Sequence, residues 1–271
     1  MNAVLAVAAL AFRESARNRV LHALLAAMLL AAFVSHVLAW VTGDDPIRRT
    51  KVIADLCLSA LVLLGSLAAI FLGTNLVYQE VERRTIYTVL ARPVSRGSFV
   101  LGKYLGLVGI VSLASAAMGA LALVAIWLGA AEGAAPAWGK LLLALVGTML
   151  ELAVVAGVAL FFSVAAHPIE GAVFAAVTAA AGHMTASLRA LGRHLLGDDP
   201  ATAPLLHRLG AGALEVLYVL LPNLEHTNFR PQAVHDLAID PLRLLWALLH
   251  ALVWMAILVA LSSLVFRKRA L

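Results

Sequence analysis

One long apolar run of this sequence is interrupted by a single acid. Glu151 lies between the uncharged stretches Leu141–Leu150 and Leu152–Ala166. A charged carboxyl group in the middle of a membrane-spanning helix costs about 2.5–3.5 kcal/mol on insertion scales, so such groups usually face other helices or a water-filled cavity. Two interpretations remain open. In the first, Glu151 has a structural role: its carboxyl group is protonated, or it is hydrogen-bonded to a neighbouring helix, for example through Thr74 or Ser112. In the second, Glu151 has a functional role: it lines a translocation pathway or couples a conformational change.

Several histidines lie near soft or acidic side chains and are candidate metal ligands. The two groups are His183 with Met184, and His226 with Glu225, His235 and Asp236. The spacing within neither group is diagnostic of a metal site. A position at headgroup level or in a loop explains these histidines more simply than a role as metal ligands. We therefore predict no metal site in this chain.

Motifs that carry common enzymatic chemistry are missing from the sequence. It has no G-x-x-x-x-G-K-[ST] phosphate loop, no H-E-x-x-H motif and no G-x-S-x-G motif, and Cys57 is its only cysteine. We therefore expect no catalytic residue and no cofactor in this chain. Any ATP and magnesium that the system uses must be bound by another chain.

A polar connection between two apolar runs has the pattern of a docking helix. Ile86, Val89 and Leu90 repeat at helical spacing and give an apolar stripe on a polar helix. Pro93 ends this helix, because proline disfavours helical geometry at the residue before it. Such a helix suits a groove in a partner protein, or the membrane interface. The candidate docking residues within segment 79–99 are Glu82, Arg83, Arg84, Ile86, Val89, Leu90 and Arg92.

The composition indicates a membrane protein. Of the 271 residues, 63% are hydrophobic and 13% are charged, whereas a soluble domain is about one quarter charged and roughly half apolar. The excess of apolar side chains must face lipid. The net charge of +5 comes from short basic clusters at the ends of apolar runs, where the positive-inside rule and headgroup contacts place them. We therefore expect membrane lipid, and not nucleic acid, as a partner.

Six apolar runs reach or approach the roughly 20 helical residues that cross a hydrocarbon core. They cover residues 20–40, 56–77, 104–131, 141–166, 171–188 and 244–266. Because only helices satisfy their own backbone in lipid, we predict an all-α membrane protein with six transmembrane helices in one domain, residues 1–271. Segment 3–18 predicts an N-terminal interfacial helix, and the run Leu209–Leu221, too short to span, predicts a re-entrant or interfacial helix before the last span.

Small residues mark one side of the third run. Gly102, Gly106 and Gly109 leave that side open for close helix packing. Packing within the bundle is a more economical explanation than a dimer interface.

The basic residues also predict orientation. Compact clusters lie in residues 13–19, 83–103 and 267–269, beside the runs, where the positive-inside rule has most force. They place both termini and segment 79–99 in the cytoplasm and segment 189–243 outside. Arg48, Arg49 and Lys51 count against this orientation.

The stretch from Glu82 to Arg96, together with Leu101–Gly106, resembles the cytoplasmic coupling segment of ABC type-2 exporter permeases. It is most similar to the NosY-like group associated with multicopper-enzyme maturation. Arg13–Arg19 resembles the connecting helix of that family, and Leu221–Phe229 resembles its outer segment before the last span. The resemblance covers nearly the whole chain.

This resemblance implies a permease subunit that forms a homodimer in the bacterial inner membrane, each copy contacting one ATP-binding-cassette ATPase. ATP-driven dimerisation of the ATPases would be transmitted through Glu82–Ala91 and would switch the facing of a cavity at the dimer interface. A periplasmic accessory protein and a role in copper-enzyme maturation belong to the same expectation. The alternative is a self-sufficient ion-coupled carrier or a metal-handling membrane protein that uses Glu151 and the intramembrane histidines.

Overall fold

The computed structural model describes residues 3–77, 95–130, 135–197 and 204–268. Within these ranges the regular structure is helical and contains no strand. The helices are α1 (Ala3–Ala16), α2 (Arg19–Val41), α3 (Pro46–Asn75), α6 (Arg96–Gly129), α7 (Trp138–Ala165), α8 (Pro168–Gly182), α9 (Thr185–Leu196), α10 (Leu205–Leu220), the short 3-10 helix η1 (Leu224–Thr227), α11 (Arg230–Val234) and α12 (Pro241–Lys268).

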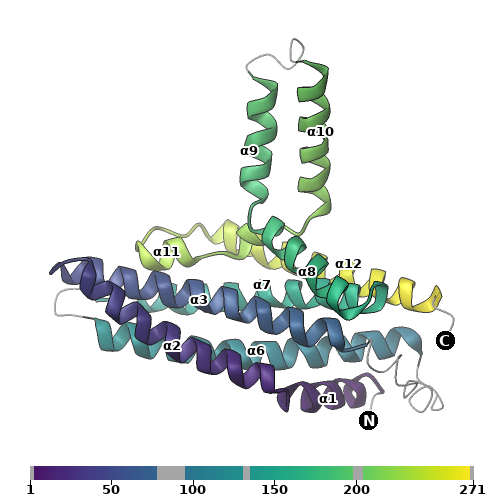
Figure 1. Ribbon diagram of the computed structural model, residues 1–271, viewed down its shortest axis with the longest axis horizontal. Helices are drawn as coiled ribbons and strands as arrows, with labels where there is room; N and C mark the ends of the chain where they lie inside the picture. Colours follow the sequence, from purple (N-terminus) through teal and green to yellow (C-terminus); the bar gives the residue numbers. More distant parts are fainter. Residues whose placement is uncertain (1–2, 78–94, 131–134, 198–203, 269–271) are drawn as a thin grey trace.

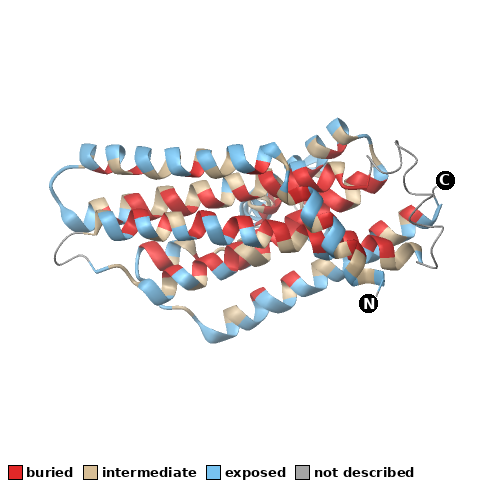
Figure 2. Ribbon diagram, turned by 90° about the horizontal axis from the view of Figure 1, so that it is seen from below, coloured by how far each residue is buried: buried red, intermediate tan, exposed pale blue. Residues whose placement is uncertain are grey.

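Long helices that lie side by side form an elongated bundle (Figure 1). Helix α7 lies at the centre of the bundle, where it contacts α3, α6, α8 and α12. Its buried side chains are mostly small or aliphatic, such as Ala156, Gly157 and Ala159, which allows neighbouring helices to approach. Exposed residues lie on the outside of the bundle and buried residues on its inside (Figure 2). Large apolar side chains such as Leu29, Leu30 and Phe33 of α2 are among the exposed ones. This is the pattern of a protein that has lipid as its solvent.

The all-helical prediction is confirmed for the described residues, whereas the count of six spans is not settled by the helices. Five helices, α2, α3, α6, α7 and α12, are long and apolar enough to cross a membrane, and the number reaches seven if two bent helix pairs are each counted as one span. The first, third, fourth and sixth predicted runs coincide with α2, α6, α7 and α12 to within a few residues, apart from the earlier start of α6.

Helix α3 begins ten residues before the predicted second run, at Pro46 instead of residue 56. Its start is defined by local chemistry rather than by hydropathy. The Asp45 side chain accepts a hydrogen bond from the backbone N–H of Ile47 at 2.9 Å, and proline suits the first helical position. The helix therefore continues through the polar residues Arg48, Arg49 and Lys51 before it becomes apolar.

The fifth predicted run, residues 171–188, is not one straight helix. Helix α8 ends at Gly182, and α9 starts at Thr185 after a bend of 67°. Helices α9 and α10 then pack against each other as a hairpin that stands roughly perpendicular to the bundle (Figure 1). The run Leu209–Leu221 lies in this hairpin, within α10. Its placement as a re-entrant or interfacial helix remains a prediction.

Helix α1 corresponds to the predicted N-terminal helix, and it packs lengthwise against α6. A Cβ atom added at Gly106 would lie 2.5 Å from the carbonyl oxygen of Ala8 and 2.7 Å from the Cβ atom of Ala11. A Cβ atom added at Gly102 would likewise lie 2.7 Å from the Cβ atom of Val7. The small side of α6 is therefore used for packing within the chain, as predicted. The interfacial position of α1 stays a prediction.

Candidate functional site

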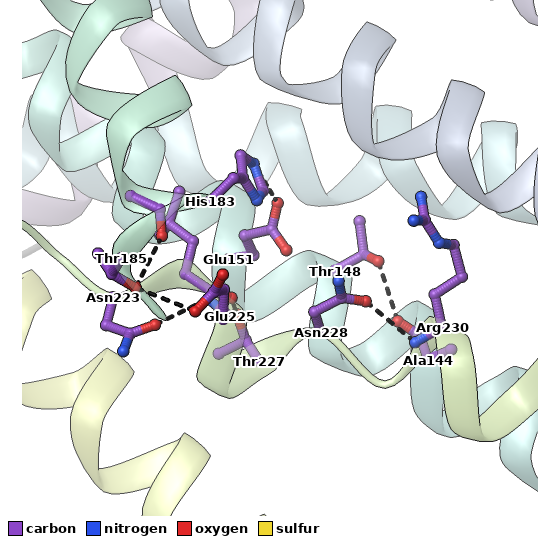
Figure 3. Close-up of polar contacts among 12 residues, drawn as sticks. Ala144, Thr148, Glu151, His183, Thr185, Asn223, Glu225, Thr227, Asn228 and Arg230 are labelled. Carbon is purple, nitrogen blue, oxygen red and sulfur yellow. Dashed lines mark hydrogen bonds and ion pairs between the residues drawn. The ribbon is translucent and has the colours of Figure 1, made fainter. Parts of the chain in front are cut away.

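The acid singled out in the sequence is buried at the centre of the fold. Glu151 lies halfway along α7 and is only 1% exposed. Its Oε1 atom lies 3.3 Å from Nε2 of His183, the residue that follows α8 (Figure 3). The bend between α8 and α9 directs this histidine toward α7. Glu151 and His183, which are distant in the sequence, are therefore in contact. Neither of the apolar runs that contain them predicts this contact by itself.

The carboxyl group of Glu151 is incompletely satisfied. Although His183 lies within ion-pair distance, Oε1 accepts no hydrogen bond from the described residues. The partner expected from the sequence, Thr74, instead donates to the Ile70 carbonyl oxygen of its own helix at 2.8 Å. Because a buried polar group without a hydrogen bond costs about 1–3 kcal/mol, such a group commonly marks a place for water, an ion or a ligand.

Helix α3 brings two hydroxyl groups to the same site. Gly65 makes this possible, because a Cβ atom there would lie 2.5 Å from Cδ1 of Leu152, the residue after Glu151. The neighbouring Ser66 has a buried hydroxyl oxygen that, like Oε1 of Glu151, has no hydrogen-bond partner among the described residues. Ser59, two helical turns away on the same face, accepts a hydrogen bond from Nη1 of Arg230 at 2.7 Å.

Arg230 reaches the site from the segment between α10 and α12. Its Nε atom lies 3.3 Å from Oδ1 of Asp55, so its charge is balanced by a carboxylate of α3. The backbone N–H of Arg230 donates to Oδ1 of Asn228 at 3.1 Å, which holds the start of α11. This segment lies close against α7 at Gly147, where a Cβ atom would be 2.7 Å from the ring of Phe229.

These groups line one cleft of about 430 Å³ between α3, α7 and α8. Its polar lining consists of Ser59, Ser66, Glu151, His183, Asn228 and Arg230. Apolar residues such as Leu63, Leu67 and Ala176 complete it. Opposite charges, hydroxyl groups and an imidazole in one partly open cleft can bind and orient a polar molecule, whereas a nucleophile activated by a base is not evident among these described residues.

Glu225 stabilises the bend that places His183. Its Oε2 atom accepts hydrogen bonds from the backbone N–H of Ala186 at 2.9 Å and from Oγ1 of Thr185 at 3.2 Å (Figure 3). Both donors belong to the first turn of α9. A carboxylate at this position satisfies free N–H groups and complements the positive end of the helix dipole. Glu225 therefore acts as a helix cap supplied from a distant part of the chain.

The candidate metal ligands are dispersed rather than convergent. His226 packs edge-on against His250, with ring centroids 4.9 Å apart, and Asp236 pairs with Lys140 at 2.6 Å. The part of the chain that the structure describes contains no group of three or more His, Cys, Asp or Glu side chains placed to hold a metal ion. His235 and Met184 are exposed.

The predicted docking residues, Glu82, Arg83, Arg84, Ile86, Val89, Leu90 and Arg92, lie outside the described residues. The sequence interpretation missed Ser59, Ser66 and Arg230 as residues that line the same cleft as Glu151, and Asp55 as the ion-pair partner of Arg230. A usable signal was present, because Arg230 directly follows the segment Leu221–Phe229 that the resemblance had singled out.

Comparison with known proteins agrees with the architecture. None of the curated proteins compared with the chain matches it. The sequence profile of the family described as ABC-2 family transporter protein matches residues 5–271, which is nearly the full length and covers all the helices described above except the first two residues of α1. The general resemblance to ABC type-2 permeases is thereby confirmed, while the match does not distinguish the NosY-like group. This multi-pass helical membrane protein belongs to the ABC-2 family of transporter proteins.

Proposed function

We propose that this chain is the permease subunit of an ATP-binding-cassette exporter in the bacterial inner membrane, acting as a homodimer with a separate ATPase on each copy. The family match across residues 5–271 is the observation that supports this proposal most strongly. Permeases of this family normally have no ATP site of their own, and the sequence has no phosphate loop. ATP and magnesium would be bound by the ATPase subunits.

The coupling segment is the proposed contact with the ATPase. Ile86, Val89 and Leu90 would fill a groove on the ATPase, and Glu82 and Arg84 would make polar contacts at its rim. An aspartate at an apolar anchor would desolvate an unpaired charge. Ile86→Asp and Leu90→Asp should therefore lose the ATPase in a pull-down from membranes, whereas Thr88→Asp, off the apolar stripe, should retain it. Full retention and stimulation of the ATPase by both anchor variants would refute the docking role.

Glu151 is the proposed polar element of the translocation pathway. The cleft in which it lies is formed by three helices and is large enough for a small molecule or a headgroup. During transport the cleft would be exposed to different sides of the membrane in turn. The resemblance to the maturation group extends the proposal to a periplasmic accessory protein and a copper enzyme. Loss of copper-enzyme activity in a deletion strain, restored by the chain, is the test of that extension.

The proposed orientation has both termini and segment 79–99 in the cytoplasm and segment 189–243 outside. Single cysteines at positions 96 and 199, in a Cys57→Ser background, test it with a membrane-impermeant thiol reagent on intact cells. We expect position 199 to be labelled and position 96 to be protected until the cells are opened. The reverse pattern would invert the topology without affecting the family assignment.

A further inference from the structure

The polar cleft around Glu151 continues into a second, apolar cleft. The two have volumes of about 430 Å³ and about 440 Å³, and Leu67, Ile70 and Ala176 line both. The apolar cleft runs between α3 and α8 and is lined chiefly by Phe71, Ala172, Val173, Pro168 and Ile169. Together they form one groove, which we call the α3–α8 groove, with a polar end at Glu151 and an apolar end near Asn75.

The apolar end of the α3–α8 groove opens onto the outer surface of the helix bundle. Phe71, Ile169 and Val173 line this end and are all exposed. Helix α8 is also short, with 15 residues against the 30 of α3, so it covers only part of that helix. An apolar surface open to the side of a membrane protein admits a hydrocarbon chain from the bilayer without a water-filled route.

The polar end has a surplus of hydrogen-bond acceptors. Arg230 lines this end, but it already contacts Asp55 at 3.3 Å and Ser59 at 2.7 Å. Glu151 has only the His183 ring at ion-pair distance, and its Oε1 atom and the Ser66 hydroxyl oxygen accept no hydrogen bond within the described residues. Asp55 is therefore balanced by Arg230, whereas Glu151 has no permanent cation within ion-pair distance among the described residues. A group that carries positive charge and several donors would complement this end, and a primary ammonium has both.

We propose that the α3–α8 groove binds an amphiphile with a primary ammonium headgroup and an apolar tail. The ammonium donates to Glu151 and Ser66, and the tail lies along Phe71 and Val173. This inference deepens the proposed function by giving the chemical class of the transported molecule, and it rests on that function only for the transport step. Binding itself requires neither an ATPase nor a second copy of the chain.

A cysteine at position 176 reports on the groove, since Ala176 lines both clefts and is exposed. The purified full chain carrying Cys57→Ser and Ala176→Cys is labelled with N-ethylmaleimide in a non-ionic detergent at neutral pH. Dodecylamine, dodecanol, dodecanoate and butylamine are added in turn. Because the tails match, dodecanol controls for simple partitioning, and butylamine carries the headgroup without the tail.

We expect dodecylamine to slow labelling by at least about tenfold relative to dodecanol, equivalent to about 1.4 kcal/mol of headgroup recognition. Butylamine should protect weakly. Glu151→Gln should remove the difference in protection between dodecylamine and dodecanol. Ser66→Ala should reduce this difference, and it serves as the second variant if Glu151→Gln elutes abnormally in gel filtration. Glu170→Gln should preserve the difference, because this acid is exposed on α8 and lines neither cleft.

Three results would overturn the proposal. Equal protection by dodecylamine and dodecanol would show that the headgroup is not recognised. Stronger protection by dodecanoate would make Arg230 the recognising group and the ligand an anion. Efficient disulfide linkage of two copies through the cysteine introduced at position 176, unaffected by any amphiphile, would show that a second copy covers the groove. None of these results bears on ATPase docking, so failure here and failure of the proposed function can be told apart.

Discussion

Two helix contacts in this protein use small residues with opposite results. Between α1 and α6, Gly102 and Gly106 bring the backbones together and leave no space. Between α3 and α8, the alanine-rich sequence of α8 leaves an open groove. Its Ala175 and Ala179 are buried, whereas Ala176 and Ala180 line the cleft and are exposed. Small residues therefore close a contact only where the partner helix runs alongside them, and α8 ends at Gly182 before it can cover α3.

The largest effect that would test this comparison is expected at Gly106. A valine there would place a methyl-bearing carbon against the Ala8 carbonyl oxygen and the Ala11 side chain, at 2.5 Å and 2.7 Å for the Cβ atom alone. Overpacking typically costs about 1–3 kcal/mol, and the backbone contact favours the upper end. Gly106→Val should thus lose most monodisperse protein in detergent at temperatures that the wild type survives.

Gly212→Ala is the matched control for a milder change at Gly106. No atom lies within 4 Å of a Cβ built at Gly212, which is in α10. Gly212→Ala should be neutral or stabilise by about 0.4–1 kcal/mol, because alanine is the better helix former. Gly106→Ala should destabilise. Equal thermal stability of the two alanine variants would show that the α1–α6 contact is not as tight as the geometry indicates.

The second effect concerns activity rather than folding. Glu151→Gln keeps the shape of the side chain but removes its charge, and Glu151→Leu also removes its hydrogen-bonding capacity. If the charge works in transport, both should abolish transport-linked ATPase activity in the assembled complex. The free energy of unfolding of the two variants should change by no more than about 1–3 kcal/mol, since Oε1 accepts no hydrogen bond from the described residues. Normal transport by a well-folded Glu151→Gln complex would defeat the charge-based role.

A smaller effect is expected at Glu225, which supports the bend beside the groove. Glu225→Ala removes the acceptor for Ala186 N–H and Thr185 Oγ1. Loss of a helix cap costs about 0.5–2 kcal/mol. Hydrogen exchange in the first turn of α9 should accelerate, while α3 and α7 exchange as before. A uniform acceleration along the whole chain would contradict a local capping role.

The smallest effect on stability is expected inside the groove itself. Ala176→Leu adds an apolar side chain where there is space and exposure, so the free energy of unfolding should change by less than about 0.5 kcal/mol, as at most surface positions. The same change should nevertheless obstruct the junction of the two clefts and reduce protection by dodecylamine of a cysteine introduced at position 180. The two substitutions should therefore differ in kind: Gly106→Val destabilises the fold, whereas Ala176→Leu leaves the fold intact and obstructs the groove.

Much of the helical structure could be predicted because the signals are local. Continuous apolar runs indicated α2, α6, α7 and α12, since a helix in lipid must satisfy its own backbone. The early start of α3 was missed because its N-terminal part is polar and hydropathy does not register the cap provided by Asp45. The break after Gly182 was missed for a related reason. The run 171–188 remains apolar across it, and the residue that caps α9, Glu225, is distant in the sequence.

The sequence by itself determined that this chain is a helical membrane protein, that it belongs to a transporter family and that Glu151 is unusual. The first and the last of these conclusions depend on composition or on residues close together in the chain, and the family follows from a sequence match over residues 5–271. Only the tertiary structure decided what surrounds Glu151, because His183, Ser66 and Arg230 come from separate segments. Their convergence depends on where α8 ends, on the close approach that Gly65 allows between α3 and α7, and on the segment before Arg230 packing against α7 at Gly147. These are contacts between distant residues, and no local pattern of hydropathy or helix propensity specifies them.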